Sequence, residues 1–202
     1  MTADPAPPRQ TIADRAVFLR RWLSKPFGVG SVTPSGAALG RAMAASTLDG
    51  LPPGGVVVEL GAGTGPITRA LLAAGLPPDR LVPVELDPAL HAHLAVAFPS
   101  LKVLRGDAAR LGELLRAHGV ERVGAVASSL PLLSLPREIV PPILEGVFDA
   151  LPPDGVLTQF TYGPASPIPA DVAASLGITG IRGRRIWSNL PPAVVWRFRR
   201  RR

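Results

Sequence analysis

The sequence has no cysteine and no long apolar run, and each absence excludes a class of protein. Without cysteine among its 202 residues, it cannot form a disulfide scaffold, a thiolate nucleophile or a cysteine-ligated metal site. The longest apolar stretch, at 123–135, is interrupted by Pro131 and is shorter than the about 20 residues that span a bilayer. The acidic, proline-rich start does not resemble a signal peptide. We therefore expect a cytoplasmic protein that is soluble or peripheral.

Charged residues are also scarce, at 18%, and those present are unbalanced. Lysine and arginine number 22 against 15 aspartates and glutamates, a formal net charge of +7. This excess indicates an anionic partner, either nucleic acid or an acidic membrane surface. The 47% of hydrophobic residues is enough for one sizeable core in a chain of this length.

Short apolar runs separated by proline and glycine make up the middle of the chain. They indicate five strands, at 56–60, 81–85, 101–104, 123–127 and 156–160. Helical stretches lie between them, at 66–74, 88–97, 108–118 and 136–150. This alternation predicts an α/β fold, a parallel sheet with helices on both of its faces.

The two ends of the chain depart from this alternation. Two helices are predicted before the sheet, at 11–25 and 35–48. After the fifth strand, a short helix at 170–175 precedes two β-rich runs, at 178–187 and 193–199. We expect these runs to form an antiparallel pair at one edge of the sheet. Residues 1–50 are predicted to be a helical extension on the membrane and substrate side, and residues 51–202 the main domain.

A glycine-rich loop, Glu59-Leu60-Gly61-Ala62-Gly63-Thr64-Gly65-Pro66, follows the first strand. Glycines let the backbone turn sharply and let a ligand approach its amide groups. A dinucleotide fingerprint needs its third glycine where Pro66 stands, and the Glu59 carboxylate would repel a pyrophosphate. A ligand with an ammonium and a sulfonium fits this carboxylate. S-adenosylmethionine is such a ligand.

Two further acidic residues stand at strand ends. Glu85 lies 24 residues after Gly61, near the spacing at which an acid meets ribose hydroxyls. Asp107 is predicted to accept a hydrogen bond from the adenine amine; alternatively, it only caps the following helix. The predicted cofactor site comprises Glu59, Gly61, Ala62, Gly63, Gly65, Glu85, Leu86, Asp107, Ala108 and Ser128.

With these motifs, residues 56–128 resemble the class I S-adenosylmethionine-dependent methyltransferases. Two segments, 84–88 and 106–108, are similar both to ribosomal RNA adenine dimethyltransferases and to bacterial phospholipid N-methyltransferases, which convert phosphatidylethanolamine to phosphatidylcholine. The resemblance implies a Rossmann-like, mainly parallel seven-stranded sheet with an antiparallel C-terminal strand pair and N-terminal helices. It also implies that residues 51–202 bind S-adenosylmethionine, without a metal.

The loop after the fourth strand separates the two families. The adenine enzymes carry Asn-Leu/Ile-Pro-Tyr there, whereas this chain has Ser129-Leu130-Pro131-Leu132, without the amide and the ring. A base would lose about 1–3 kcal/mol of stacking, while an aliphatic amine has no ring to stack. The segments 27–35, 159–164 and 187–196 also resemble the phospholipid enzymes.

The amine that accepts the methyl group needs neighbouring groups that orient it. Tyr162, the only tyrosine, follows the fifth strand and is predicted to do so; alternatively, it only packs against the site wall. Ser128, Ser129 and the Leu130 carbonyl are predicted to assist it.

Basic residues beside aromatic ones indicate a membrane-facing surface. On the first helix, Arg15 and Arg20 flank an apolar stripe that has Phe18 and Trp22 at its edges, and Arg21 and Lys25 lie opposite. This pattern is typical of a helix in a membrane interface; packing on the sheet is the alternative. At the C-terminus, Trp196 and Phe198 accompany the arginines, which could instead follow RNA phosphates or remain solvated. The predicted membrane or substrate residues are Phe18, Arg20, Arg21, Trp22, Lys25, Arg184 and Arg185.

These observations predict stepwise N-methylation of phosphatidylethanolamine toward phosphatidylcholine. The enzyme would lie on the inner face of the cell membrane, with anionic lipid rather than nucleic acid as its partner. One alternative is an RNA adenine N-methyltransferase. A second is a lipid- or cofactor-binding module without catalysis.

Overall fold

The computed structural model describes residues 34–201. The helix predicted at 11–25 lies outside this range, and so do five of the predicted membrane or substrate residues: Phe18, Arg20, Arg21, Trp22 and Lys25.

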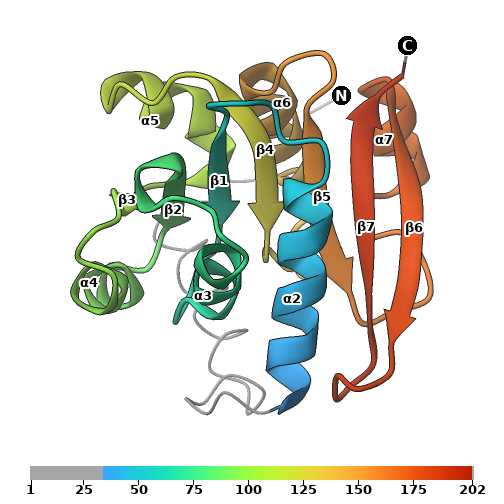
Figure 1. Cartoon of the computed structure of the whole chain (residues 1–202). Helices are drawn as coiled ribbons and strands as arrows, with labels where there is room; N and C mark the ends of the chain where they lie inside the picture. The colour runs from blue at the N-terminus through green and yellow to red at the C-terminus, as the bar shows by residue number, and fades with distance from the viewer. Residues whose placement is uncertain (1–33, 202) are drawn as a thin grey trace, which may run out of the picture. The chain divides into compact units, whose positions relative to one another are not determined.

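A seven-stranded sheet in the order β3-β2-β1-β4-β5-β7-β6 forms the centre of the described part (Figure 1). Its strands are β1 (Val56–Leu60), β2 (Leu81–Glu85), β3 (Leu104–Arg105), β4 (Val123–Ser128), β5 (Val156–Thr161), β6 (Ile178–Ile186) and β7 (Ala193–Arg200). The first five strands pair in parallel, and β7 runs antiparallel to both β5 and β6. This confirms the predicted fold class. The strand order reverses beside β1, where open sheets of this kind bind ligands at the carboxyl ends of their strands.

Helices cover both faces of this sheet. They are α2 (Pro34–Leu48), α3 (Pro66–Ala73), α4 (Pro88–Ala97), α5 (Leu111–Ala117), α6 (Val140–Ala150) and α7 (Ala170–Ser175), with single 3₁₀ turns at Pro78–Arg80, Ala108–Arg110 and Leu132–Ser134. Helix α2 contacts α3 and also β4, β5 and β7, and α5 packs against α6. Figure 1 shows α2 and α3 in front of the sheet and α6 behind it. No helix in the described range combines the length and the apolar character needed to cross a bilayer.

The core lies between α2, α3 and the central strands. Every residue of β2 and of β4 is buried, as expected for parallel strands covered on both faces. Met43 of α2, Leu71 of α3 and Val57 of β1 are fully buried in one hydrophobic cluster. This packing holds the carboxyl ends of the strands in place.

Two predicted boundaries were wrong for physical reasons, and one predicted helix is divided into two elements. The third strand was predicted at 101–104, but β3 has only two residues, because the amides of Leu101 and Val103 bond to carbonyls within the preceding turn. The helix predicted from residue 136 begins at Val140, since 136–139 form a turn closed by a bond from the Ile139 amide to the Pro136 carbonyl. The stretch at 108–118 divides into the 3₁₀ turn Ala108–Arg110 and α5.

The C-terminal hairpin forms as predicted, but its aromatic residues do not lie where the sequence suggested. Phe198 is only 2% exposed and packs so closely on Gly180 that a Cβ there would come within 2.4 Å of the ring. Trp196 is half-buried. In the turn between β6 and β7, the large hydrophobic residues that are exposed are instead Trp187 (73%) and Leu190 (81%).

Candidate functional site

The glycine loop is a left-handed turn at the carboxyl end of β1. Gly61, Gly63 and Gly65 have φ angles of 68°, 60° and 81°, which favour glycine over other residues. The Gly61 amide donates to the Val84 carbonyl of β2 at 3.0 Å. A Cβ at Gly65, the N-cap residue before α3, would lie 2.5 Å from the Phe98 ring. The loop therefore passes closely between β2 and α4.

Gly63 differs from its neighbours because it has room beside it. Among the described residues, a Cβ at Gly63 would meet only the Gly61 carbonyl oxygen, 4.0 Å away. Its amide donates to Glu85 Oε2 at 2.8 Å. The loop thus offers open space next to backbone groups, as a small ligand requires.

Glu85 connects this loop to the end of β2. The side chain is 1% exposed, and its other oxygen, Oε1, accepts a bond from the Asp87 amide at 2.9 Å. Burial raises the pKa of Glu85, although the bonds from the backbone amides oppose this. Each carboxylate oxygen can accept more than one hydrogen bond, so Glu85 can hold the loop and still accept bonds from a ligand.

Glu59 has a fully buried carboxyl group, and one of its two oxygens accepts no hydrogen bond from the described residues. Its Oε2 accepts a bond from the Thr68 hydroxyl at 2.6 Å, whereas its Oε1 has no partner among the described residues. Burial raises the pKa of Glu59 to about 8, and the Thr68 bond only partly opposes this. A buried acceptor without a donor is costly unless a ligand supplies one. The ammonium of S-adenosylmethionine is a donor of that kind, so these residues fit this cofactor.

Asp107 caps the turn after β3, as the alternative interpretation expected. Its Oδ1 accepts a bond from the Ala109 amide at 2.9 Å. The Gly106 amide donates to the Glu85 carbonyl at 3.1 Å, which holds the ends of β2 and β3 together. Leu86 is half-buried and Ala108 is buried beside these two ends. The contact predicted between Asp107 and adenine stays a prediction.

Residues 129–135, which we call the acceptor loop because they are predicted to face the amine that accepts the methyl group, pack directly on the glycine loop. The Ser129 amide donates to the Leu60 carbonyl at 2.9 Å, and the Leu130 amide donates to the Ser128 hydroxyl at 3.3 Å. A Cβ at Gly61 would lie 2.9 Å from Leu130 Cδ2. The structure therefore brings the predicted cofactor and acceptor segments together at the edge of β1 and β4.

Gln159 of β5 belongs to this arrangement, and the sequence analysis did not single it out. Its side chain is 1% exposed, and Nε2 donates to the Leu130 carbonyl at 3.0 Å and to the Phe160 carbonyl at 3.0 Å. The Leu130 carbonyl, predicted to face the acceptor amine, is thus held by an amide from the neighbouring strand. A polar residue within an apolar strand was the available signal.

Tyr162 follows the end of β5 and is 41% exposed. Its ring meets Phe160 edge-on, with centroids 5.5 Å apart. Partial burial raises the pKa of the Tyr162 hydroxyl, so the phenol stays protonated at neutral pH.

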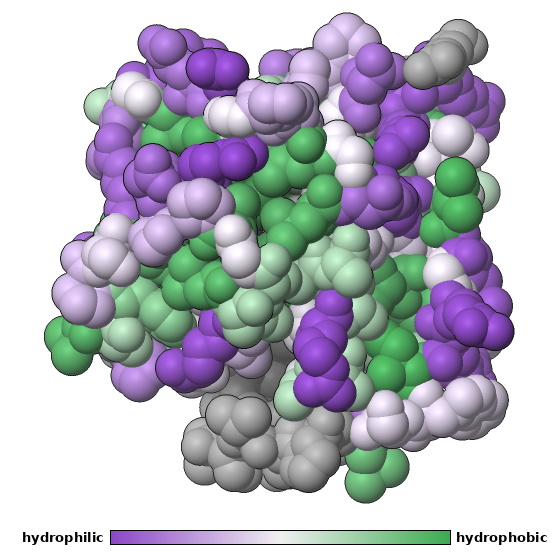
Figure 2. Space-filling model, in the orientation of Figure 1, coloured by the Kyte–Doolittle hydropathy of each residue, from purple (hydrophilic) through white to green (hydrophobic). Residues whose placement is uncertain are grey.

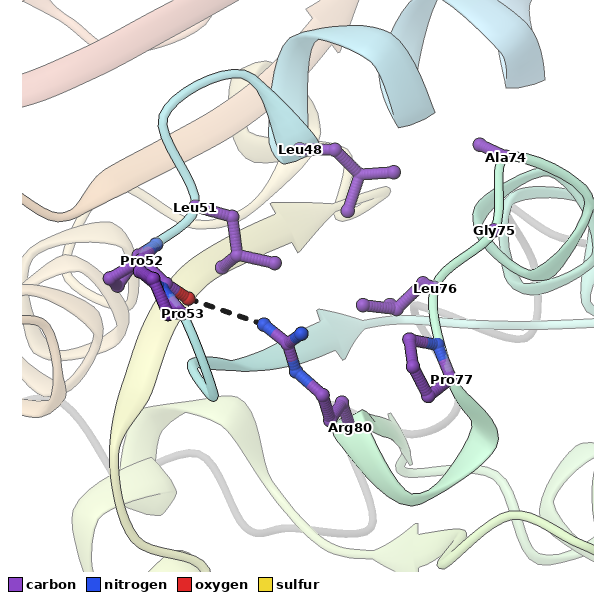
Figure 3. Close-up of a pocket in the computed structure, with 9 residues that line it drawn as sticks. All are labelled: Leu48, Leu51, Pro52, Pro53, Ala74, Gly75, Leu76, Pro77 and Arg80. Carbon is purple, nitrogen blue, oxygen red and sulfur yellow. Dashed lines mark hydrogen bonds between the residues drawn. The ribbon is translucent and has the colours of Figure 1, made fainter.

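A separate hollow lies at the opposite edge of the sheet, near the amino end of β1 (Figure 3). It has a volume of about 240 Å³ and is lined by the C-terminal ends of α2 and α3 and by Arg80. The Arg80 guanidinium donates to the Gly55 carbonyl at 2.7 Å and to the Pro52 carbonyl at 3.2 Å. This arginine therefore holds the loop before β1. Within residues 34–201, no group of three or more acidic or histidine side chains is placed to hold a metal.

Comparison with known proteins identifies the family, although no family model matches the chain. Over 156 residues, the chain is 33% identical to an ornithine lipid N-methyltransferase from Singulisphaera acidiphila; the match covers 75% of this chain and 79% of that protein.

Solved structures agree on the fold. A 1,6-didemethyltoxoflavin-N1-methyltransferase from Burkholderia thailandensis, solved with S-adenosylhomocysteine, has a TM-score of 0.68 at 20% identity; the match covers 99% of this chain and 95% of that one. The magnesium protoporphyrin IX methyltransferase from Synechocystis, solved with S-adenosylmethionine, has a TM-score of 0.65 at 15% identity, with coverages of 93% and 98%. The chain therefore belongs to the class I S-adenosylmethionine-dependent methyltransferases, in one family with the Singulisphaera lipid N-methyltransferase.

Proposed function

We propose that this methyltransferase N-methylates the amine of a membrane lipid, and that phosphatidylethanolamine, methylated stepwise toward phosphatidylcholine, is its substrate. The observation that carries this proposal is the acceptor loop packed on the glycine loop. Leu130 and Leu132 are buried in it and Leu133 is 55% exposed, and the loop contains neither an aromatic ring nor a side-chain amide. Such a loop suits a lipid headgroup and the start of its acyl chains better than a planar base.

Ornithine lipid is a second candidate substrate, because the 33% identical relative is named as an ornithine lipid N-methyltransferase. Both lipids present a primary aliphatic amine, so the same acceptor groups serve either one. The difference would lie in how the rest of the headgroup is held. The reaction class is common to both candidates.

The proposed cofactor contacts use the groups at the ends of β1, β2 and β3. The unfilled Glu59 Oε1 accepts from the ammonium, and Glu85 accepts from the ribose hydroxyls while holding Gly63. The rest of the proposed pocket is formed by Gly61, Ala62, Gly65, Leu86, Asp107, Ala108 and Ser128. S-adenosylmethionine supplies an activated methyl group on its sulfonium when bound.

On the acceptor side, the chain must bind an ammonium and favour its neutral form. A free alkylammonium has a pKa of about 10.4, and burial at the site lowers that value. The protonated Tyr162 phenol offers its oxygen as a hydrogen-bond acceptor to the amine. The Leu130 carbonyl accepts bonds from Gln159 Nε2 at 3.0 Å and from the Leu132 amide at 2.9 Å, which fix its position. We propose that it faces the amine from there, with Ser128 and Ser129 beside it.

Transfer of a labelled methyl group tests the proposal. The enzyme is offered phosphatidylethanolamine vesicles, ornithine lipid vesicles and ribosomal RNA in parallel, with Glu59→Gln as the inactive control. We expect label in phosphatidylethanolamine, with mono-, di- and trimethylated products appearing in turn. Label only in ornithine lipid would identify that lipid as the substrate instead. Label only in RNA would overturn the proposal. Cofactor binding without label in any acceptor would indicate a binding module.

A further inference from the structure

The basic excess of the chain comes entirely from its C-terminal part. Residues 172–202 carry eight arginines and no acidic residue, which leaves 14 lysines and arginines against 15 acidic residues in 1–171. Two of these arginines are paired, Arg197 with Asp49 and Arg200 with Asp149. Within the described range, Arg182, Arg184 and Arg185 of β6 form no ion pair. Their charge is therefore available to an outside partner.

Exposed apolar side chains gather at one edge of the sheet. Six large hydrophobic side chains are exposed in the described part of the chain, and four of them follow strands at the carboxyl edge of the parallel sheet. These four, which we call the apolar rim, are Leu133, Tyr162, Trp187 and Leu190. The other two, Val96 at the end of α4 and Ile181 in the middle of β6, lie elsewhere.

The register of the sheet places the β6–β7 turn beside the candidate site. Val194 of β7 pairs with Thr161 at the end of β5 on one side and with Arg185 on the other. Two strand spacings separate β5 from β6, about 10 Å. In Figure 1 this turn lies at the lower end of the hairpin, the end toward which β1, β4 and β5 also point. Figure 2 shows hydrophilic residues interspersed with hydrophobic ones along the hairpin, and a hydrophobic group projecting at its lower end.

The turn itself is ordered by its own hydrogen bonds. Asn189 is 5% exposed, its Nδ2 donates to the Pro191 carbonyl at 2.6 Å, and its amide donates to the Ile186 carbonyl at 3.3 Å. The Arg185 guanidinium lies 5.1 Å from the centroid of the Trp187 ring. Asn189 thus points inward, and Trp187 and Leu190 project outward from a fixed loop.

We propose that the apolar rim, with Arg184 and Arg185 beside it, is a docking surface for an anionic lipid bilayer. This deepens the proposed function, on which it rests, since docking there brings the acceptor loop to the headgroup layer. Tryptophan and leucine would enter the interface while the arginines contact lipid phosphates. RNA would satisfy the arginines but would leave Leu133 and Leu190 in water, so the bilayer accounts for more of the surface.

Sedimentation with vesicles tests the docking surface. The variant Trp187→Ser/Leu190→Ser is compared with the wild type and with Val96→Ser/Ile181→Ser, which removes equally exposed apolar groups away from the rim. On phosphatidylglycerol–phosphatidylethanolamine vesicles, we expect the rim variant to bind on the order of tenfold more weakly. The control variant should bind like the wild type. The variant Arg184→Ser/Arg185→Ser should lose about fivefold per arginine on these vesicles and nothing on phosphatidylcholine vesicles.

Methylation of detergent-dispersed lipid separates this inference from the proposed function. The rim variant should methylate dispersed lipid like the wild type, because the glycine and acceptor loops are intact. Vesicle binding of the rim variant equal to that of the wild type would overturn the docking surface whatever the activity. An equal loss of binding in the rim variant and in the Val96→Ser/Ile181→Ser control would overturn it too. Weaker binding to ribosomal RNA with unchanged vesicle binding would also overturn it. A wild type that binds vesicles but methylates no dispersed lipid would contradict the proposed function alone.

Discussion

Glu59 makes the stability of the cofactor-free protein depend on pH. The pKa of its carboxyl group is about 8 in the folded protein and near the ordinary value of 4.5 in the unfolded chain. Between these values the folded state binds more protons, so stability is highest below about pH 4.5 with respect to this group and falls as pH rises toward 8. The total effect on the free energy of unfolding is on the order of 5 kcal/mol.

Thermal unfolding between pH 5 and 9 checks this expectation on Glu59→Gln. The variant keeps an acceptor for Thr68 and has no proton to lose, so its stability should decline less across the range and exceed that of the wild type at the alkaline end. Glu113→Gln, at an exposed ion pair with Arg110, is the matched control and should follow the wild type. Parallel curves for Glu59→Gln and the wild type would mean that Glu59 is already ionised in the fold.

Gly63 allows ligand binding to be separated from stability. The Gly63→Ala variant adds a methyl group into open space at a φ of 60°, so it costs about 1 kcal/mol of backbone strain. Gly119→Ala, at a φ of 61° with nothing described within 4 Å, costs the same strain far from the site. We expect similar melting temperatures for both variants but weaker S-adenosylmethionine binding only in Gly63→Ala, by calorimetric titration. Equal affinities for S-adenosylmethionine in the two variants would show that the cofactor does not bind beside Gly63.

At the scale of elements, sequence periodicity predicted the sheet and its order of helices, because buried parallel strands are continuous apolar runs. It could not predict that β3 has two residues, since local turn bonds compete there with the ladder. It also could not say which face Phe198 occupies. That depends on the register with β5, which pairs Phe198 with Leu157 and buries its ring. The role of Gln159 depends likewise on the pairing of β4 with β5.

Gln159 couples β5 to the acceptor loop, and a substitution can test this coupling. In Gln159→Leu the Leu130 carbonyl loses its bond to β5 and keeps only the local bond from the Leu132 amide, so the loop should shift relative to the cofactor. We expect kcat for lipid methylation to fall on the order of tenfold while the Kd for S-adenosylmethionine stays unchanged. Thr158→Val is the matched control: Thr158 is buried on the same strand, and its hydroxyl has no partner among the described residues. Similar kcat values for the two variants would show that Gln159 only fills the core.

For the molecule as a whole, net charge alone allowed a membrane or a nucleic acid. The structure shows that the excess positive charge lies on the C-terminal hairpin and that four of the six exposed large hydrophobic side chains in the described range lie at the carboxyl edge of the sheet. This arrangement gives the described unit two unlike edges. The hollow with Arg80 is at the amino edge, and the glycine loop, the acceptor loop and the rim are at the other. Under the proposed function, only the second edge faces lipid.

An enzyme that works through one edge should methylate only the leaflet it faces. In large sealed vesicles the outer leaflet holds about half of the phosphatidylethanolamine, and a surface-bound enzyme leaves the inner half untouched. We therefore expect labelled methyl incorporation to stop near half of the total amine, and to proceed to completion when detergent opens the vesicles. Thin-layer separation of the methylated lipids measures both plateaus. Complete reaction in vesicles shown to be sealed by a trapped dye would mean that the acceptor amine is not taken from the facing leaflet through this edge.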